Sequence, residues 1–276
     1  MKTVTLSTGQ QVPMIGQGTW MMGERPDRRE DELAALRAGV DLGMTLIDTA
    51  EMYGNGAAES LIGEALGDRR DELFLVSKAF PHNASRQRLA ASCEASLKRL
   101  GTDRLDLYLL HWRGEVPLAE TVEGMEALQR AGKIRHWGVS NLDTDDMEEL
   151  VEAGGMACVT DQILYNLTRR GPEQELLPWL FEQGMTAMAY SPVEQGRLLG
   201  HPVLAKIAGE IGASPAQVAL AWTMRSGRVI AIPKAGTVEH VRENRAAADL
   251  VLPSDVLDAL DAAFPRPARP IPLEML

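Results

Sequence analysis

Side chains that can hold or exchange protons stand at the ends of apolar runs in the first half of the chain. Asp48, Lys78 and His111 each follow such a run, and Tyr53 lies a few residues beyond Asp48. A free phenol has a pKa near 10 and is a poor proton donor at pH 7. A lysine ammonium within about 4–6 Å favours the phenolate and lowers that pKa. An aspartate paired with the lysine keeps the ammonium charged in a partly desolvated cleft.

Together, these side chains predict proton transfer to an oxygen that gains negative charge. A histidine such as His111 can donate a hydrogen bond to a substrate oxygen and hold it in place. Carbonyl reduction requires this chemistry, and general acid catalysis of this kind contributes about 10²–10⁴-fold. No side chain supplies a hydride, so we expect a nicotinamide cofactor.

Later apolar runs end in groups that suit such a cofactor. The Ser-Asn pair at 140–141 and Gln162 could hold a carboxamide, and the ring of Tyr190 could stack on a planar group. Lys234, beside a helix start at Thr237, could hold a phosphate. Each residue alone could simply face solvent, cap a helix or pack in the core, and only their convergence points to a cofactor site.

One pattern repeats along the chain: an amphipathic, helix-like segment ends in glycine and a short apolar run follows. The glycines are Gly43, Gly67, Gly101, Gly132 and Gly184, and the runs span 44–47, 73–76, 105–110, 134–139 and 185–190. Each glycine stands where a helix takes a left-handed residue after its last turn. Unbroken apolar runs are typical of strands buried on both faces.

The polar residues that end the runs recur mostly at about 30 residues, the length of one strand–helix unit. They are Asp48, Lys78, His111, Ser140, Asp161, Ser191 and Lys234. The longer last interval leaves room for a loop and an additional helix pair. With an early run at 14–18, eight units are expected, which predicts an α/β fold, a (β/α)8 barrel, as one domain over 1–276. Active sites of such barrels lie at the C-terminal ends of the strands, where these residues would meet.

Two terminal segments fall outside the repeat. Runs at 3–6 and 10–12 flank Ser7-Thr8-Gly9 and predict a β-hairpin that caps the bottom of the barrel. The proline-rich segment 265–272 predicts a short extended tail over the surface. The alternative fold, a doubly wound open sheet, usually carries GxGxxG, and neither Gly16-x-Gly18 nor Gly54-x-Gly56 completes that motif.

Composition narrows the class of partner. The 276 residues include 28 basic and 39 acidic side chains, a net charge of −11, which argues against binding nucleic acid or an anionic membrane.

Two cysteines offer no disulfide framework, and the N-terminus has no apolar leader, so we expect a cytoplasmic protein. No HExxH, Cys/His cluster or P-loop is present, and no metal site is expected.

Several segments together resemble aldo-keto reductase signatures, in order and at the family's spacing. They are residues 46–54, 76–78, 109–112, 138–141, 189–192 and 232–234. The resemblance implies a barrel that binds NADPH across its rim without a Rossmann domain and reduces aldehydes and ketones. It implies Tyr53 as general acid, Lys78 and Asp48 as its tuning pair, and His111 as the residue that orients the substrate.

The resemblance also assigns residues to the cofactor and to the carbonyl pocket. The cofactor residues are Gly18, Thr19, Trp20, Asp48, Ser140, Asn141, Gln162, Tyr190, Ser191, Pro192, Gly196, Leu198, Ile232, Lys234, Thr237, His240, Arg242 and Asn244. The substrate residues are Trp20, Tyr53, Phe80, His111 and Trp112. An aromatic wall suits small or medium carbonyls, and the chain resembles bacterial members that reduce methylglyoxal and other small aldehydes.

Two residues depart from the family pattern, and the length of the tail also bears on the substrate pocket. His240 stands where many members have arginine, with Arg242 nearby on another helical face, so NADH is also possible. Asp161 stands where the family often has asparagine; near the carboxamide it could accept from the NH2 but could not donate. The C-terminal tail, which closes the pocket in longer members, is short.

Two other functions stay open. A Schiff-base lyase or aldolase could use Lys78 as nucleophile, which leaves Tyr53 and the Ser-Asn pair without roles. A non-catalytic NADPH-binding sensor or regulatory subunit would bind the cofactor tightly without turnover. We expect a monomer or weak oligomer with a small-molecule carbonyl substrate.

Overall fold

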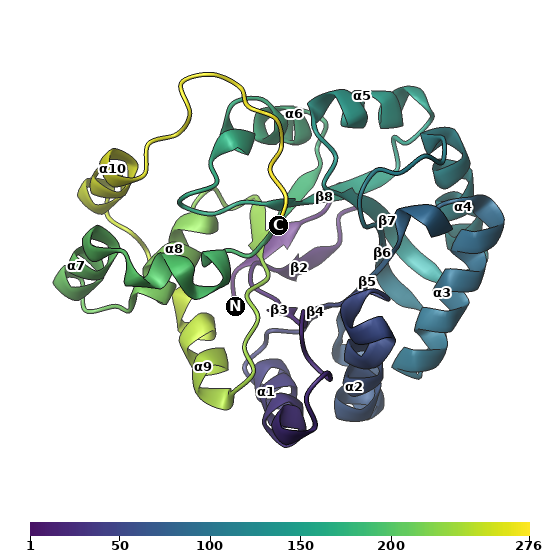
Figure 1. Cartoon of the computed structure of the whole chain (residues 1–276), viewed down its shortest axis with the longest axis horizontal. Helices are drawn as coiled ribbons and strands as arrows, with labels where there is room; N and C mark the ends of the chain where they lie inside the picture. The colour runs from purple at the N-terminus through teal and green to yellow at the C-terminus, as the bar shows by residue number, and fades with distance from the viewer.

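The computed structural model describes all 276 residues and is built on eight parallel strands curled into a closed barrel (Figure 1). The strands are β3 (Gln17–Gly18), β4 (Leu46–Asp48), β5 (Phe74–Ala79), β6 (Leu105–Leu110), β7 (Ile134–Ser140), β8 (Cys158–Leu164), β9 (Thr186–Tyr190) and β10 (Val229–Ala231). They pair in chain order, and the seam closes where Gly16 N donates to Ala231 O (2.9 Å) and Gly18 N donates to Pro233 O (3.0 Å). The predicted (β/α)8 barrel is confirmed.

Helices surround the barrel on its outside, as Figure 1 shows. They are α1 (Arg29–Asp41), α2 (Ala57–Leu66), α3 (Arg86–Leu100), α4 (Leu118–Arg130), α5 (Thr144–Glu152), α6 (Leu176–Glu182), α7 (Pro202–Glu210), α8 (Pro215–Thr223), α9 (Val238–Ala247) and α10 (Ser254–Ala263). The helix pair expected in the long last interval is α7 and α8. None of these helices is long and apolar enough to cross a membrane.

Two apolar cores hold the layers together. The larger one lies between the strands and the helices and includes Leu61, Leu89 and Met125. The smaller one contains residues from alternate strand positions inside the barrel, such as Leu46 and Leu109. Strand residues are therefore buried on both faces, which explains the unbroken apolar runs.

The hairpin of β1 (Thr3–Thr5) and β2 (Gln11–Pro13) confirms the predicted cap. Its buried side chains Val4, Leu6 and Val12 belong to the same core as the barrel interior. The hairpin thus closes the bottom of the barrel, at the end away from the C-terminal strand ends.

Two details of the predicted pattern are wrong. Gly67 has φ −59°, whereas Gly43, Gly101, Gly132 and Gly184 have φ between 66° and 85°. The chain continues from α2 into a 3-10 segment, Gly67–Glu72, which needs no left-handed residue. Asp161 does not end its strand, because β8 continues to Leu164.

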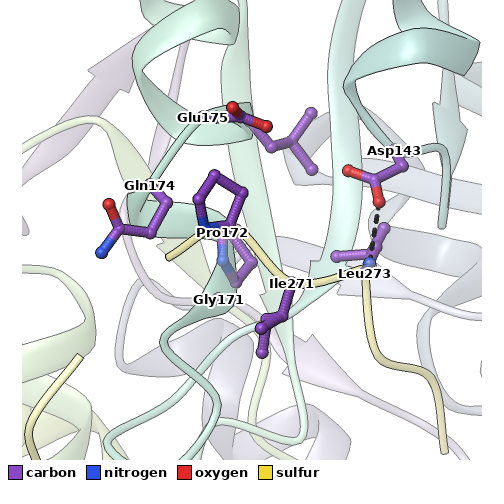
Figure 2. Close-up of a pocket in the computed structure, with 9 residues that line it drawn as sticks. Asp143, Gly171, Pro172, Gln174, Glu175, Ile271 and Leu273 are labelled. Carbon is purple, nitrogen blue, oxygen red and sulfur yellow. Dashed lines mark hydrogen bonds between the residues drawn. The ribbon is translucent and has the colours of Figure 1, made fainter. Parts of the chain in front are cut away.

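The C-terminal tail extends further over the molecule than expected. In Figure 1 the yellow tail leaves α10, arches over the rim and ends near the centre of the barrel. Figure 2 shows its middle part, where Ile271 lies against Gly171 and the Leu273 amide donates to Asp143 Oδ2 (2.8 Å). An extended chain covers the most distance per residue. A tail that is short in sequence therefore still reaches the open end of the barrel at the C-terminal ends of the strands, called the mouth below.

Candidate active site

Lys78 lies at the centre of the cluster predicted from the strand ends. Its ammonium donates to Asp48 Oδ2 (2.8 Å), to the Thr49 carbonyl (2.9 Å) and to the Tyr53 hydroxyl (3.1 Å). Lys78 is 0% exposed and Asp48 is 2% exposed. The neighbouring strands β4 and β5 bring these residues together, and a 3-10 turn, Tyr53–Gly56, points the phenol back at the lysine. The predicted convergence is therefore confirmed as geometry.

The pKa of Tyr53 differs from the sequence-based expectation. Burial raises the pKa of the phenol above its ordinary value, and the charge and hydrogen bond of Lys78 only partly offset this rise. Tyr53 is thus protonated at neutral pH, the form that an acid needs. The pKa of Lys78 is raised as well, because Asp48 and Tyr53 outweigh the effect of burial. The lysine stays charged, and an ammonium at this distance would stabilise a phenolate.

His111 lies beside the phenol as a neutral imidazole. Its ring centroid is 5.9 Å from that of Tyr53 in an edge-on arrangement. Burial, together with the positive charge of Lys78, lowers the pKa of His111 to about 3. Its Nδ1 has no protein partner. A neutral imidazole carries one N–H donor, so His111 can donate a hydrogen bond to a substrate oxygen without adding a charge.

The residues assigned to the nicotinamide carboxamide lie next to this cluster. Gln162 Nε2 donates to Asp48 Oδ1 (2.8 Å), and since a carboxylate only accepts, Gln162 Oε1 is left for another donor. Ser140 Oγ donates to the Gln162 carbonyl (2.7 Å). Tyr190 OH donates to Asn141 Oδ1 (2.9 Å), which joins the C-terminal ends of β7 and β9 across β8.

Asp161 does not join them, which corrects the expectation that it approaches the carboxamide. Successive strand residues face opposite sides, and because Gln162 points into the barrel, Asp161 points to the helices. It is fully buried, and burial raises its pKa well above the ordinary value, opposed by the backbone amides of Leu142 and Asn141.

The loop after β9 has several residues in the left-handed backbone region. Ser191, Glu194, Gln195 and Gly196 have φ values of 47°, 51°, 55° and 87°. Two of its N–H groups are used within the loop, because Glu194 N donates to Ser191 O and Gly196 N donates to Val193 O (2.9 Å each). Left-handed turns of this kind can present other N–H groups to an anion. Pro192 and Leu198 belong to the same loop.

Free cations follow β10, the strand that pairs with β9. Lys234 follows Ile232 and pairs with Gly18 across the seam. Next to Gly18, the Thr19 hydroxyl donates to the Asp48 carbonyl (2.9 Å). Lys234 is exposed and forms no ion pair, and the same is true of Arg242; His240 is exposed as well. Thr237 caps α9 by accepting from His240 N (3.4 Å), and Asn244 is buried on the same helix. An amide edge, a loop in left-handed conformation and unpaired cations together fit a pyridine dinucleotide.

Aromatic side chains form one wall of the mouth. Phe80 and Trp112 meet edge to face with centroids 5.9 Å apart, and Trp112 lies 4.9 Å from His111. Trp20 is 42% exposed. His82, which the sequence did not single out, stacks on Phe80 at 4.9 Å.

Sequence reasoning missed the supporting residues around the site. Glu51 accepts from Phe80 N (2.7 Å), Asn83 Nδ2 (3.0 Å) and Ser92 Oγ (2.6 Å), so it joins the Tyr53 loop to the aromatic wall. Its position inside the motif 46–54 was a signal that the acid–base argument did not use. Arg169, whose contacts are described below, lies in the loop after β8, beyond Asp161, where the sequence pattern placed the strand end, and was not singled out.

A closed (β/α)8 barrel with a buried phenol, ammonium, carboxylate and imidazole at its C-terminal mouth defines a barrel enzyme with acid chemistry. Residues 14–264 match the model of the aldo/keto reductase family, and the chain belongs to this family. It is 51% identical to methylglyoxal reductase YeaE of Escherichia coli, over 100% of this chain and 99% of the relative. It is 34% identical to glyoxal reductase of Bacillus subtilis, over 94% and 92%.

A solved structure is equally similar. The aldo/keto reductase from Klebsiella pneumoniae, crystallised in complex with NADP and acetate, superposes with a TM-score of 0.97 at 50% identity. The match covers 100% of this chain and 99% of that chain.

Proposed function

We propose that the protein reduces small aldehydes and ketones to alcohols with NADPH, in the class of methylglyoxal. The observation that carries this proposal is the Lys78 ammonium, 3.1 Å from the Tyr53 hydroxyl and paired with Asp48 in a buried site. Family membership and the two relatives named for glyoxal and methylglyoxal reduction support it.

Tyr53 acts as the general acid. Its hydroxyl gives a proton to the carbonyl oxygen as negative charge develops there, and Lys78 stabilises the resulting phenolate through the existing hydrogen bond. His111 holds the carbonyl oxygen by a hydrogen bond from its neutral ring. Bound NADPH would supply the hydride. Asp48 keeps Lys78 charged, and its second oxygen is held by Gln162.

The cofactor residues divide between the two ends of the dinucleotide. Ser140, Asn141 and Gln162 take the carboxamide, and Tyr190 provides a ring for stacking. The loop from Ser191 to Leu198 suits the pyrophosphate. Ile232 and Lys234 follow β10, with Gly18 across the seam, and Thr237, His240, Arg242 and Asn244 lie at the start of α9 and along it. Because Lys234 and Arg242 are unpaired cations, they favour a 2′-phosphate and hence NADPH over NADH, even with His240 in place of arginine.

The geometry argues against the lyase. A Schiff-base nucleophile must be a neutral amine, whereas Lys78 directs its ammonium at three acceptors and its pKa is raised.

A site complete within one chain also supports a functional monomer. Cys93 and Cys158 are buried free thiols, which fits a reducing compartment such as the cytoplasm.

The proposal is tested by following absorbance at 340 nm with NADPH or NADH and a panel of aldehydes that includes methylglyoxal. We expect NADPH-dependent turnover that is fastest with small aldehydes. Tight NADPH binding without turnover of any aldehyde would instead identify a sensor, and borohydride trapping of an adduct on Lys78 would identify a lyase.

A further inference from the structure

Arg169 connects the C-terminal tail to the loop that follows β9. Its Nη2 and Nε atoms donate to Glu194 Oε1 (2.9 and 3.2 Å), and its Nη1 forms an ion pair with Glu274 of the tail. One guanidinium therefore joins two segments that are far apart in the sequence, at the side of the mouth assigned to the cofactor pyrophosphate.

Glu194 is held in place from several directions. It is only 5% exposed, and besides Arg169 it accepts from Asn166 Nδ2 (2.7 Å) and Arg197 Nη2 (3.0 Å). Burial alone would raise the pKa of Glu194, but these hydrogen bonds lower it overall, so the carboxylate stays charged. The residue has φ +51°, a left-handed conformation that is strained for a non-glycine residue and persists only where the surroundings impose it.

The tail also contacts the other wall of the nicotinamide site. Asp143 lies shortly after Asn141; its Oδ1 accepts from Thr144 N at the start of α5 and its Oδ2 accepts from Leu273 N (Figure 2). At the tip of the tail, the Leu276 amide lies close enough to the Tyr190 hydroxyl to favour its ionised form, although burial raises the pKa of Tyr190 overall.

We propose that Arg169 is a positioning residue for cofactor binding: with Glu274, it holds Glu194 and thereby the left-handed loop 191–198 in the shape that binds the pyrophosphate. This inference rests on the proposed function, because it takes loop 191–198 as part of the NADPH site. A tail that only shaped the carbonyl pocket would affect the carbonyl KM. Arg169 contacts the loop assigned to the pyrophosphate, so its replacement should instead change the affinity for NADPH.

The test compares Arg169→Met, Arg169→Lys and Glu274→Gln with Glu126→Gln as the matched control. Glu126 pairs with Arg130 on α4, and its side chain is 38% exposed, as is that of Glu274. The dissociation constant and dissociation rate of NADPH are measured by stopped-flow fluorescence, and the carbonyl KM is measured at saturating NADPH.

We expect Arg169→Met to weaken NADPH binding by at least about tenfold, mainly through faster dissociation. Arg169→Lys should recover part of the loss, because lysine keeps the charge but not the fork geometry. Glu274→Gln should show a smaller loss, and Glu126→Gln none. The carbonyl KM should change by less than about twofold for all four variants, within the usual scatter of surface substitutions.

Unchanged NADPH binding in Arg169→Met and Glu274→Gln would overturn the proposal, as would a rise in the carbonyl KM alone. If Arg169→Met does not fold, as judged by thermal unfolding, Glu274→Gln on the exposed tail decides the question. A wild-type protein that does not bind NADPH would overturn the proposed function as well, and this outcome is visible before any variant is compared.

Discussion

At the scale of single residues, the ammonium of Lys78 organises the site. Each of its three protons has an acceptor, and only one acceptor, the phenol of Tyr53, can itself release a proton to a substrate. The other two, Asp48 and the Thr49 carbonyl, fix the position and charge of the lysine. In the proposed mechanism, Tyr53 is therefore a proton donor whose conjugate base has a stabilising partner in place before the reaction begins.

Replacing Tyr53 by phenylalanine should lower kcat by about 10²–10⁴-fold or more, the range for general acid catalysis. The NADPH dissociation constant should change little, because the phenol donates only to the carbonyl substrate. Steady-state kinetics at 340 nm measure kcat, and a fluorescence titration with NADPH measures the dissociation constant. Similar turnover by the variant and the wild type would remove Tyr53 from the mechanism.

His111 should make folding sensitive to acid. Its pKa is about 3 in the folded protein against 6.5 for an ordinary histidine. Below pH 6.5 the unfolded chain takes up a proton that the folded protein does not take up until about pH 3, so stability falls as the pH drops through this window. The linkage amounts to about 2 kcal/mol between pH 7 and pH 5.

Urea unfolding at the two pH values tests this prediction. His111→Asn removes the titrating group, so the variant should lose about 2 kcal/mol less than the wild type on acidification. Equal losses in both proteins would show that the folded-state pKa of His111 is not depressed.

At the scale of elements, Glu51 shows how loops at the mouth depend on one another. The carboxylate lies in the loop after β4, yet its three donors belong to the loop after β5 and to α3. The general acid and the aromatic wall are thus positioned by one shared side chain.

Glu51→Ala should destabilise the fold by about 1–3 kcal/mol, because partly buried donors lose their acceptor. It should also raise the carbonyl KM, because the Phe80 amide is released. Chemical denaturation and steady-state kinetics measure the two effects. Glu72→Ala, which removes an exposed ion pair with Arg69, is the control and should change stability by less than about 0.5 kcal/mol. A KM equal to that of the wild type would show that Glu51 does not position the wall.

The strand order and the convergence of Asp48, Tyr53, Lys78 and His111 could be predicted because strand–helix repeats leave periodic apolar runs with polar ends. Glu51 and Arg169 could not, because their partners come from segments distant in sequence. The net direction of the Tyr53 pKa was also missed, because the sequence shows the neighbouring charge and hides the degree of burial. Asp161 was misplaced because β8 continues beyond its first charged residue.

At the scale of the whole molecule, the barrel has a closed end and an open end. The hairpin β1–β2 fills the bottom with Val4, Leu6 and Val12, and the chemistry lies at the opposite, C-terminal strand ends. The inner core is continuous with this cap, so the stability of the barrel should depend on it.

Val12→Ala should lower the free energy of unfolding by about 1–3 kcal/mol, since Val12 is 0% exposed and its methyl groups fill the inner core. Val251→Ala is a matched control, because Val251 is 73% exposed and its loss should stay within about 0.5 kcal/mol. Urea unfolding at constant pH gives both values. Equal effects would show that the hairpin is not part of the cooperative core.

The course of the tail also determines how this molecule can be handled. Its last residue, Leu276, lies at the mouth beside Tyr190, whereas the first strand packs under the barrel. An affinity tag or surface tether joined after Leu276 would crowd the path of incoming aldehydes. The same attachment ahead of Met1 would leave that path open, so immobilised preparations should be coupled through the N-terminal end.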